Sequence, residues 1–438
     1  MPNALAFRSR FRLPNPWRGL GGLPADVWII FATSLVNRAG MMALPFLVLY
    51  LTQYLHVSAR LAGLAISAYG VGGMIAAPIA GPWSDRVGAF TVVRASLVLT
   101  GIVLLIIPLA HNFAVVATLT FLWGFVADAI RPATMSAITN AASPEQRKAA
   151  IAVNRLAINL GMSIGPAIGG FLAVVSFPLL FVVDGGSSLG AALVLTGLLR
   201  FRRPPETAPG GADAGPVTPA RSHATRAHRG SVWRNRAALP FLIGIFLVSA
   251  VFMQNEGALP LYVVRDLHHR ASFVGMMFMI NTLLIVLTEV PLNLAMHAWP
   301  HRRALVLGAL LTAVGFGAMG TVRGTLAIAF TVVFWTFGEM IVFPVGTAYV
   351  ADLAPPGRSG EYMGAYATMF SLAMVVGPWA GTAALDRFGS LATWTGVFAC
   401  GLLAAVVIGL TVEQNRGAEP DSPPDPRLSI DSATALAE

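Results

Sequence analysis

The sequence predicts an all-α polytopic membrane protein whose twelve transmembrane helices form two homologous six-helix bundles. Its composition is the first reason: 56% of the 438 residues are hydrophobic and 11% are charged, whereas soluble domains carry about 25% charged residues. Long apolar segments recur along the whole chain, and landmarks of the first half recur in the second half. A soluble globular protein is excluded because too few polar residues are available to cover its surface.

Twelve apolar segments each approach or exceed the roughly 20 residues that a spanning helix requires. They are residues 27–54, 60–82, 91–110, 114–140, 148–175, 178–200, 237–264, 272–296, 304–322, 325–351, 361–385 and 391–412. The predicted organisation is therefore a cytoplasmic N-terminal segment (1–26), a first bundle (27–200), a disordered linker (201–236), a second bundle (237–412) and a disordered tail (413–438). Residues 1–26 contain no short apolar core before a cleavage site, so we expect no removable signal peptide.

The distribution of basic residues predicts the orientation. Eight arginines lie between Arg200 and Arg236, and four more lie in the N-terminal segment. Because basic loops stay in the cytoplasm, we expect both termini and the linker to be cytoplasmic, in a multi-pass membrane protein. This topology also accounts for the net charge of +9, so no nucleic-acid partner is expected.

The two halves of the chain repeat each other. An offset of 212 residues aligns five pairs of identical residues without a gap: Pro132 with Pro344, Pro144 with Pro356, Gly165 with Gly377, Pro166 with Pro378 and Gly169 with Gly381. In the first span of each half, an offset of 215 places Ser34 on Ser249, Ala43 on Ala258 and Pro45 on Pro260. Since six spans are an even number, the halves enter the membrane in the same direction and are related by an axis along the membrane normal.

A glycine face marks the fifth span. Gly161, Gly165 and Gly169 recur every four residues, and such faces let two helix backbones approach closely in lipid. Pro166 weakens the backbone hydrogen-bond ladder and permits a bend. Because "GPAIGG" and "GPWAG" stand at equivalent positions, we predict a hinge in each half, the second one at Gly377 and Pro378. The alternative is ordinary small-residue packing.

Two motifs resemble the major facilitator superfamily. "GMSIGPAIGG" resembles the fifth-helix motif of its drug:proton antiporters, and "GPWSDRVG" resembles its signature loop between the second and third helices. The loop matches through Gly81, Asp85, Arg86 and Gly88, which the resemblance implies act as a conformational latch. The basic pair that usually follows is replaced by Ala89 and Phe90. The resemblance implies a twelve-helix bacterial multidrug exporter that works by alternating access.

Three acidic residues inside spans of the second half are candidates for proton coupling. A charged residue at the centre of a spanning helix costs about 2.5–3.5 kcal/mol, so each needs a function or a partner. Glu339 matches a carboxylate that related exporters protonate; the alternative is a neutral side chain bonded to a neighbouring helix. Glu256 is a candidate for a proton or for a substrate cation, and Glu289 for proton coupling, gating or packing. Gln254 and Asn255 adjoin Glu256, and these three consecutive side chains cannot all face the same way.

Ionisable residues in the spans of the first half are mostly basic. Asp128 and Arg131 are three residues apart, so that they can share one helix face as an ion pair or as part of a gate. Arg38 and Asn37 are candidates for an anionic substrate group or an acidic partner. Arg155 can extend to the membrane interface, and its neighbour Asn154 replaces an acidic residue of related exporters. The cleft between the bundles is thus predicted to have a basic and an acidic wall. The predicted apolar wall consists of Phe252, Met253, Phe278, Met279, Trp335 and Phe343.

Several chemistries have no support in the sequence. The single cysteine, Cys400, allows no intramolecular disulfide, and no metal-binding cluster, nucleophile–base pair or phosphate-binding GxxxxGK[ST] loop occurs. We therefore expect neither an enzyme, nor a cofactor, nor ATP as the energy source. The prediction is a secondary transporter that couples proton entry to efflux of amphipathic, cationic, drug-like compounds. Its expected partners are a small-molecule substrate, protons and lipids, and it is expected to be a monomer. The alternatives are a transporter for an anionic solute, peptide or lipid, and a receptor that does not translocate.

Overall fold

The structure is a computed structural model that describes residues 22–143, 145–200, 232–236, 238–296, 298–355 and 358–412. All regular secondary structure in these ranges is helical. The predicted N-terminal segment, linker and tail lie wholly or mostly outside the described residues.

The helices follow the order of the predicted spans. Their bounds are α1 Ala25–Gly40, α2 Ala43–Leu49, η2 Tyr50–Tyr54, α3 Ala59–Val87, α4 Ala89–Ile106, η3 Ile107–Leu109, α5 Phe113–Asp128, α6 Ile130–Ala141, α7 Arg147–Val175, α8 Phe177–Arg200, η4 Val232–Arg234, α9 Ala238–Phe252, η5 Met253–Asn255, α10 Ala258–Leu261, η6 Tyr262–Asp266, α11 Ala271–Met296, α12 His301–Gly317, η7 Ala318–Gly320, α13 Thr325–Leu353 and α14 Ser359–Thr411.

Twelve membrane crossings are present in the described part of the chain. Eleven segments are long and apolar enough to cross a membrane, and one of them, α14, has 53 residues. Gly389 interrupts α14 with φ 78° and ψ 175°, a conformation that residues with a Cβ rarely adopt. It divides α14 into two spans, so the predicted count and the predicted all-α fold are confirmed.

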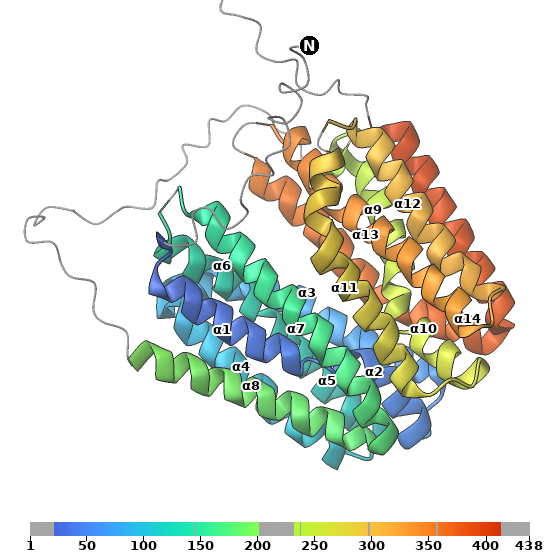
Figure 1. The fold of residues 1–438 in the computed structure, drawn as a ribbon, viewed down its shortest axis with the longest axis horizontal. Helices are drawn as coiled ribbons and strands as arrows, with labels where there is room; N and C mark the ends of the chain where they lie inside the picture. The colour runs from blue at the N-terminus through green and yellow to red at the C-terminus, as the bar shows by residue number, and fades with distance from the viewer. Residues whose placement is uncertain are drawn as a thin grey trace, which may run out of the picture.

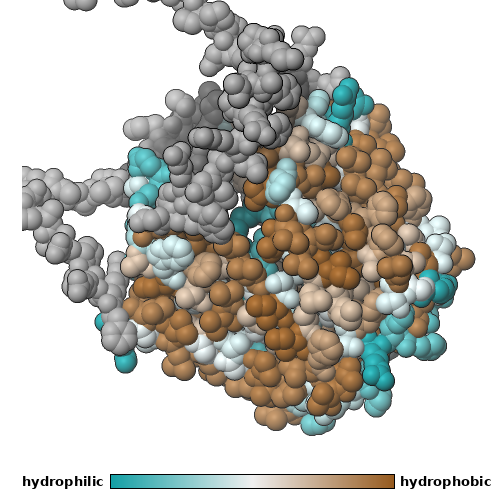
Figure 2. Space-filling model, in the orientation of Figure 1, coloured by the Kyte–Doolittle hydropathy of each residue, from teal (hydrophilic) through white to brown (hydrophobic). Residues whose placement is uncertain are grey.

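The twelve spans form two bundles, drawn from blue to green and from yellow to red in Figure 1. Because each bundle has six spans, α1 and α9 begin, and α8 and α14 end, on one face, here called the linker face. The opposite face, here called the far face, carries the short connections that follow the first, third and fifth span of each bundle. Apolar side chains cover much of the outside of both bundles (Figure 2), as expected for a surface that contacts lipid.

The bundles meet near the far face and separate toward the linker face. One apolar core cluster includes buried side chains of both halves, among them Phe181 and Tyr262. Nearer the linker face the apolar clusters are separate: one lies in the second half around Phe241, and two lie in the first half around Val27 and Leu97. The ribbons of the two bundles diverge toward the linker face in Figure 1, and the separate apolar clusters place the open side of the cleft at that face.

The structural repeat follows a single offset. The π-helical turns Tyr50–Tyr54 and Tyr262–Asp266 are 212 residues apart, and so are His56 and His268, which both adopt positive φ. The same offset holds in the first span of each half. A Cβ added to Gly169 would contact Met42, and one added to the equivalent Gly381 would contact Gln254. The predicted offset of 215 for these spans is therefore wrong, because the similar letters there do not occupy equivalent positions.

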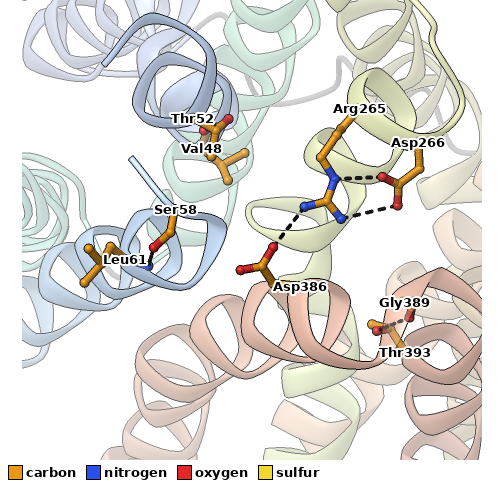
Figure 3. A network of polar contacts seen from close by, with 9 residues as sticks. All are labelled: Val48, Thr52, Ser58, Leu61, Arg265, Asp266, Asp386, Gly389 and Thr393. Atoms are coloured by element: carbon orange, nitrogen blue, oxygen red, sulfur yellow. Dashed lines mark hydrogen bonds and ion pairs between the residues drawn. The ribbon is translucent and has the colours of Figure 1, made fainter. Parts of the chain in front are cut away.

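Polar contacts at the far face lie within each half of the chain (Figure 3). Arg265 pairs with Asp266 at 2.7 Å and with Asp386 of α14 at 3.4 Å. Ser58 Oγ accepts a hydrogen bond from the Leu61 amide at the first turn of α3, which is a standard N-cap. Arg265 thereby connects η6 to α14, and Ser58 caps the first turn of α3.

Candidate transport cavity

A cavity of about 540 Å³ lies between the two bundles. Five charged residues line it: Arg38, Asp128 and Arg131 from the first half, and Glu256 and Glu339 from the second. Its apolar lining includes Met41, Met135, Met162, Phe252, Phe278, Phe370 and Met374. Aromatic and methionine side chains around a few polar groups are typical of small-molecule sites.

Glu339 lies at the middle of α13, and its side chain is buried against α11. Asn281 Nδ2 donates a hydrogen bond of 2.6 Å to Glu339 Oε1, and the same amide donates to Thr336 Oγ1 at 3.0 Å. Asn281 is itself buried. The carboxyl group therefore has one neutral hydrogen-bond partner beside the cavity, an arrangement that accommodates either protonation state.

An irregular segment presents Glu256 to the cavity. After α9 the chain forms the 3₁₀ turn η5, and α10 begins only after Gly257, which packs against Pro378 of α14. Gln254 turns away from the cavity and donates to the Gly377 carbonyl at 3.0 Å, whereas Asn255 and Glu256 line the cavity. The three side chains thus diverge as predicted. Gln254 itself packs between helices, which corrects its prediction as a cavity residue.

The basic wall begins where α1 ends. Met41 and Met42 separate α1 from α2, and the buried Asp184 of α8 accepts hydrogen bonds from the amides of Met42 and Ala43, at 3.1 and 3.0 Å. Asp184 thus satisfies amide groups at the start of α2, which otherwise lack partners. This break places Arg38 at the cavity, where its Nη1 lies 3.0 Å from Met41 Sδ.

Asp128 and Arg131 form the ion pair that their spacing predicted. Arg131 Nε lies 3.4 Å from Asp128 Oδ1, and the Arg131 side chain is 64% exposed. Pro132 explains the local break between α5 and α6, because a proline ring clashes with the carbonyl four residues earlier. Arg131 consequently lines the cavity from the start of α6.

Asparagines of the first half, among them Asn37 and Asn154, add to the polar lining. Asn154 accepts a hydrogen bond of 2.9 Å from Ser34, and Asn37 donates one of 3.3 Å to Ser188. Both asparagines line the cavity. Among the described residues, no group of three or more His, Cys, Asp or Glu side chains is arranged to hold a metal ion.

The family model of the Major Facilitator Superfamily matches residues 29–270 and 255–434. The chain belongs to the Major Facilitator Superfamily. It is a multi-pass membrane transporter and not an enzyme, and the predicted resemblance is confirmed.

Relatives and solved structures agree with this membership. The transporter is 25% identical to the MFS-type transporter YqjV of Bacillus subtilis, over 84% of this chain and 88% of the relative. It is also 25% identical to Multidrug resistance protein 1 of the same organism, over 74% and 80%. Among solved structures, a peptide transporter POT superposes with a TM-score of 0.73 at 17% identity, over 90% and 95% of the chains, and a D-xylose–proton symporter with 0.70 at 14%, over 90% and 98%. Both show the fold.

Each of the two glycine-proline stretches of the transporter contacts a helix of its own bundle and a helix of the opposite bundle. Gly165 packs against the carbonyl groups at the end of α1, and Gly377 packs against Ala250 of α9. The other face of each glycine-proline stretch contacts the opposite bundle: Gly275 lies on the Pro166 carbonyl oxygen, and Gly63 on the Pro378 carbonyl oxygen. These two seams, α7 with α11 and α3 with α14, join the bundles near the far face. The hinge role remains a prediction.

One seam carries an ion pair that the other seam lacks. Arg155 of α7 pairs with Glu289 of α11, with side chains 56% and 14% exposed. The equivalent positions on α14 and α3, 212 residues away, are Ala367 and Ala77. Arg155 therefore pairs across the bundles, where the sequence suggested that it extends to the interface. Neither residue lines the cavity.

Other predicted residues lie elsewhere. Trp335 is only 1% exposed and packs against Phe252 and Phe316, so it lies behind the cavity wall. Asp85 and Arg86, predicted to lie in a loop, stand in the last turns of α3 with exposed side chains, and within the described residues no ion pair involves either of them. The latch role of these residues stays a prediction.

Sequence reasoning missed the partners of the key carboxyl groups. Asn281 lies in the first half of a mostly apolar span, and an amide side chain among apolar neighbours was the available signal. The cap formed by Asp184 had no local signal, because its acceptor and donor groups are about 140 residues apart in the chain.

Proposed function

We propose that this transporter is a proton-coupled exporter of amphipathic, cationic, drug-like compounds that works by alternating access in the bacterial inner membrane. The observation that carries the proposal is Glu339, a buried carboxyl group at the middle of α13 that lines a largely apolar cavity between the bundles. A multidrug resistance protein among the relatives is consistent with this substrate class.

Coupling follows from competition for the carboxyl groups of the second half. A cationic compound in the cavity is attracted to a deprotonated carboxylate, and a proton that binds there removes that attraction. Asn281 holds Glu339 in one orientation in either protonation state. Closing the cleft over an unpaired charge is costly, so the cleft closes around a bound cation or around a protonated carboxyl group. Proton entry and substrate exit are thereby exchanged.

Alternating access follows from the two seams. The close glycine contacts near the far face would open while the signature loop at the linker face, with Asp85 and Arg86, closes. With both termini and the linker in the cytoplasm, the open cleft would take substrate from the cytoplasm or the inner leaflet. One chain supplies both walls of the cavity, so a monomer surrounded by lipid is sufficient.

The test is substrate-driven proton movement in proteoliposomes with a panel of lipophilic cations. The wild type is compared with Glu339→Gln, and with Glu145→Gln as a matched change in an exposed loop. We expect proton flux in the wild type and in the loop variant, and its loss in Glu339→Gln. Flux retained in Glu339→Gln would remove Glu339 from the coupling path and make Glu256 the next candidate.

An anionic substrate is the second candidate function, because Arg131 lines the cavity with a largely exposed guanidinium group. If none of the cations drives proton flux, the same assay with amphipathic anions tests it. Flux with anions that disappears in Arg131→Gln would support this second function against the first.

A further inference from the structure

The charges that face the cavity are segregated between its walls. The first half contributes two guanidinium groups and one carboxylate, from Arg38, Arg131 and Asp128, whereas the second half contributes only carboxyl groups, from Glu256 and Glu339. Each wall belongs to a different bundle, so a ligand that spans the cleft contacts one basic and one acidic wall.

On the basic wall, Arg131 has unused donor capacity. Its ion pair with Asp128 is long, at 3.4 Å, and is made through Nε, the nitrogen nearest the aliphatic chain. No hydrogen bond to Arg131 occurs among the described residues, and its side chain is 64% exposed at the cavity. Asp184 does not cancel this charge, because it lies behind Arg38, does not line the main cavity and accepts from two backbone amides.

On the acidic wall, Glu256 has unused acceptor capacity. Its Oε2 is buried and has no hydrogen-bond partner within the described part of the chain, and the same holds for Oδ1 of the adjacent Asn255. Both residues line the cavity. Glu339 differs, because Asn281 already donates to it. A buried acceptor without a donor is costly, so a ligand that donates to Glu256 and Asn255 is favoured at this end.

We propose that the cavity selects zwitterionic amphipathic compounds, with Arg131 holding the anionic group, Glu256 and Asn255 holding the cationic group, and the methionine and phenylalanine side chains holding an apolar core between them. This rests on the proposed function in one respect, that the cavity is the transport site. It narrows the substrate class from cations to molecules that carry both charges, and it separates the cation site at Glu256 from the proton site at Glu339.

The selectivity follows from desolvation. A ligand with a single charge satisfies one wall and leaves the opposite charged group facing an apolar surface, where losing water is not compensated. A zwitterion satisfies both walls, and hydrogen bonds to charged groups are the strong ones. We expect the gain over a singly charged analogue to be at least about tenfold in affinity, which corresponds to about 1.4 kcal/mol.

The test uses three analogues with one aromatic core: an aryl-piperazine carboxylic acid, its methyl ester, which is cationic, and its N-acetyl derivative, which is anionic. Binding to the full chain in nanodiscs is measured by calorimetry for the wild type, Arg131→Gln, Arg131→Lys and Glu256→Gln. Arg270→Gln, a change at an exposed residue outside the cavity, is the matched control.

In the wild type and in Arg270→Gln, the zwitterion is expected to bind at least about tenfold more tightly than either analogue. Arg131→Gln should remove the advantage over the methyl ester while leaving the affinity for the ester unchanged, and Arg131→Lys should keep part of it. Glu256→Gln should remove the advantage over the N-acetyl derivative. Equal affinity for the zwitterion and the ester in the wild type, or an equal loss for both in Arg131→Gln, would overturn the inference.

Proton flux in the same preparations separates this inference from the proposed function. Flux driven by the methyl ester without any zwitterion preference would support the proposed function and refute the inference. A zwitterion preference without substrate-driven flux would support the inferred binding mode and refute proton coupling.

Discussion

The two copies of the glycine-proline stretch differ in how tightly they are packed, so the same substitution should affect them unequally. A Cβ at Gly165 would lie 2.7 Å from the Met41 carbonyl oxygen and 3.0 Å from the Arg38 carbonyl oxygen. Both contacts are with backbone, which cannot rotate away. At Gly377 the nearest atoms, the Ala250 carbonyl oxygen and the Met253 Cβ, are both 3.0 Å away.

These distances set the expected magnitudes. Overpacking costs about 1–3 kcal/mol, whereas replacing glycine by alanine inside a helix gains about 0.8–1.0 kcal/mol. Gly165→Ala should therefore lower the free energy of unfolding by up to about 2 kcal/mol, as the balance of these two effects. Gly377→Ala should be close to neutral. In α8, Gly190 has nothing within 4 Å of an added Cβ, so Gly190→Ala should be neutral or slightly stabilising.

The assay is thermal unfolding of the three variants and the wild type in one detergent. The expected order of midpoints is Gly190→Ala at or above the wild type, then Gly377→Ala, then Gly165→Ala. Equal midpoints for Gly165→Ala and Gly190→Ala would refute the reasoning, because the glycine face of α7 would then not be needed for its close contact with α1. A Gly377→Ala midpoint below that of Gly165→Ala would refute the distance argument.

Two further predictions concern buried partners. Asp184→Ala leaves the amides of Met42 and Ala43 without their acceptor, and since an unsatisfied buried group costs about 1–3 kcal/mol, the unfolding midpoint should fall; an unchanged midpoint would show that other acceptors replace the carboxylate. Arg155→Gln and Glu289→Gln, combined in a double-mutant cycle of unfolding free energies, should give a coupling of about 0.2–1 kcal/mol, because the Arg155 side chain is 56% exposed and its charge is screened. A coupling above about 2 kcal/mol would contradict a partly solvated pair.

Much of the fold was predictable because transmembrane helices are marked by length and hydropathy alone. The predicted span 148–175 corresponds to α7, Arg147–Val175, and the spans 361–385 and 391–412 are separated in the structure at Gly389. The ion pair of Asp128 with Arg131 was also predictable, because it depends on helical spacing within one segment.

The site was predictable only in part. The sequence showed that ionisable residues inside the spans are mostly basic in the first half and acidic in the second half, since charges inside spans are rare enough to stand out. It did not identify which side chains face the cavity. Gln254 packs between helices, whereas the adjacent Asn255 and Glu256 line the cavity, because the 3₁₀ turn and Gly257 change the direction of the chain within a few residues. Trp335, on α13, packs behind the cavity wall.

The sequence by itself determined the class of the protein, the number of spans and the repeat, since these depend on the bilayer thickness and on local order along the chain. Only the tertiary structure decided the pairing of Arg155 with Glu289, of Asn281 with Glu339, and of Asp184 with the start of α2. These contacts join helices that are distant in the chain, and they depend on the rotation of each helix about its own axis. That rotation is set by how helices pack against one another, as the close approaches at the glycine faces illustrate.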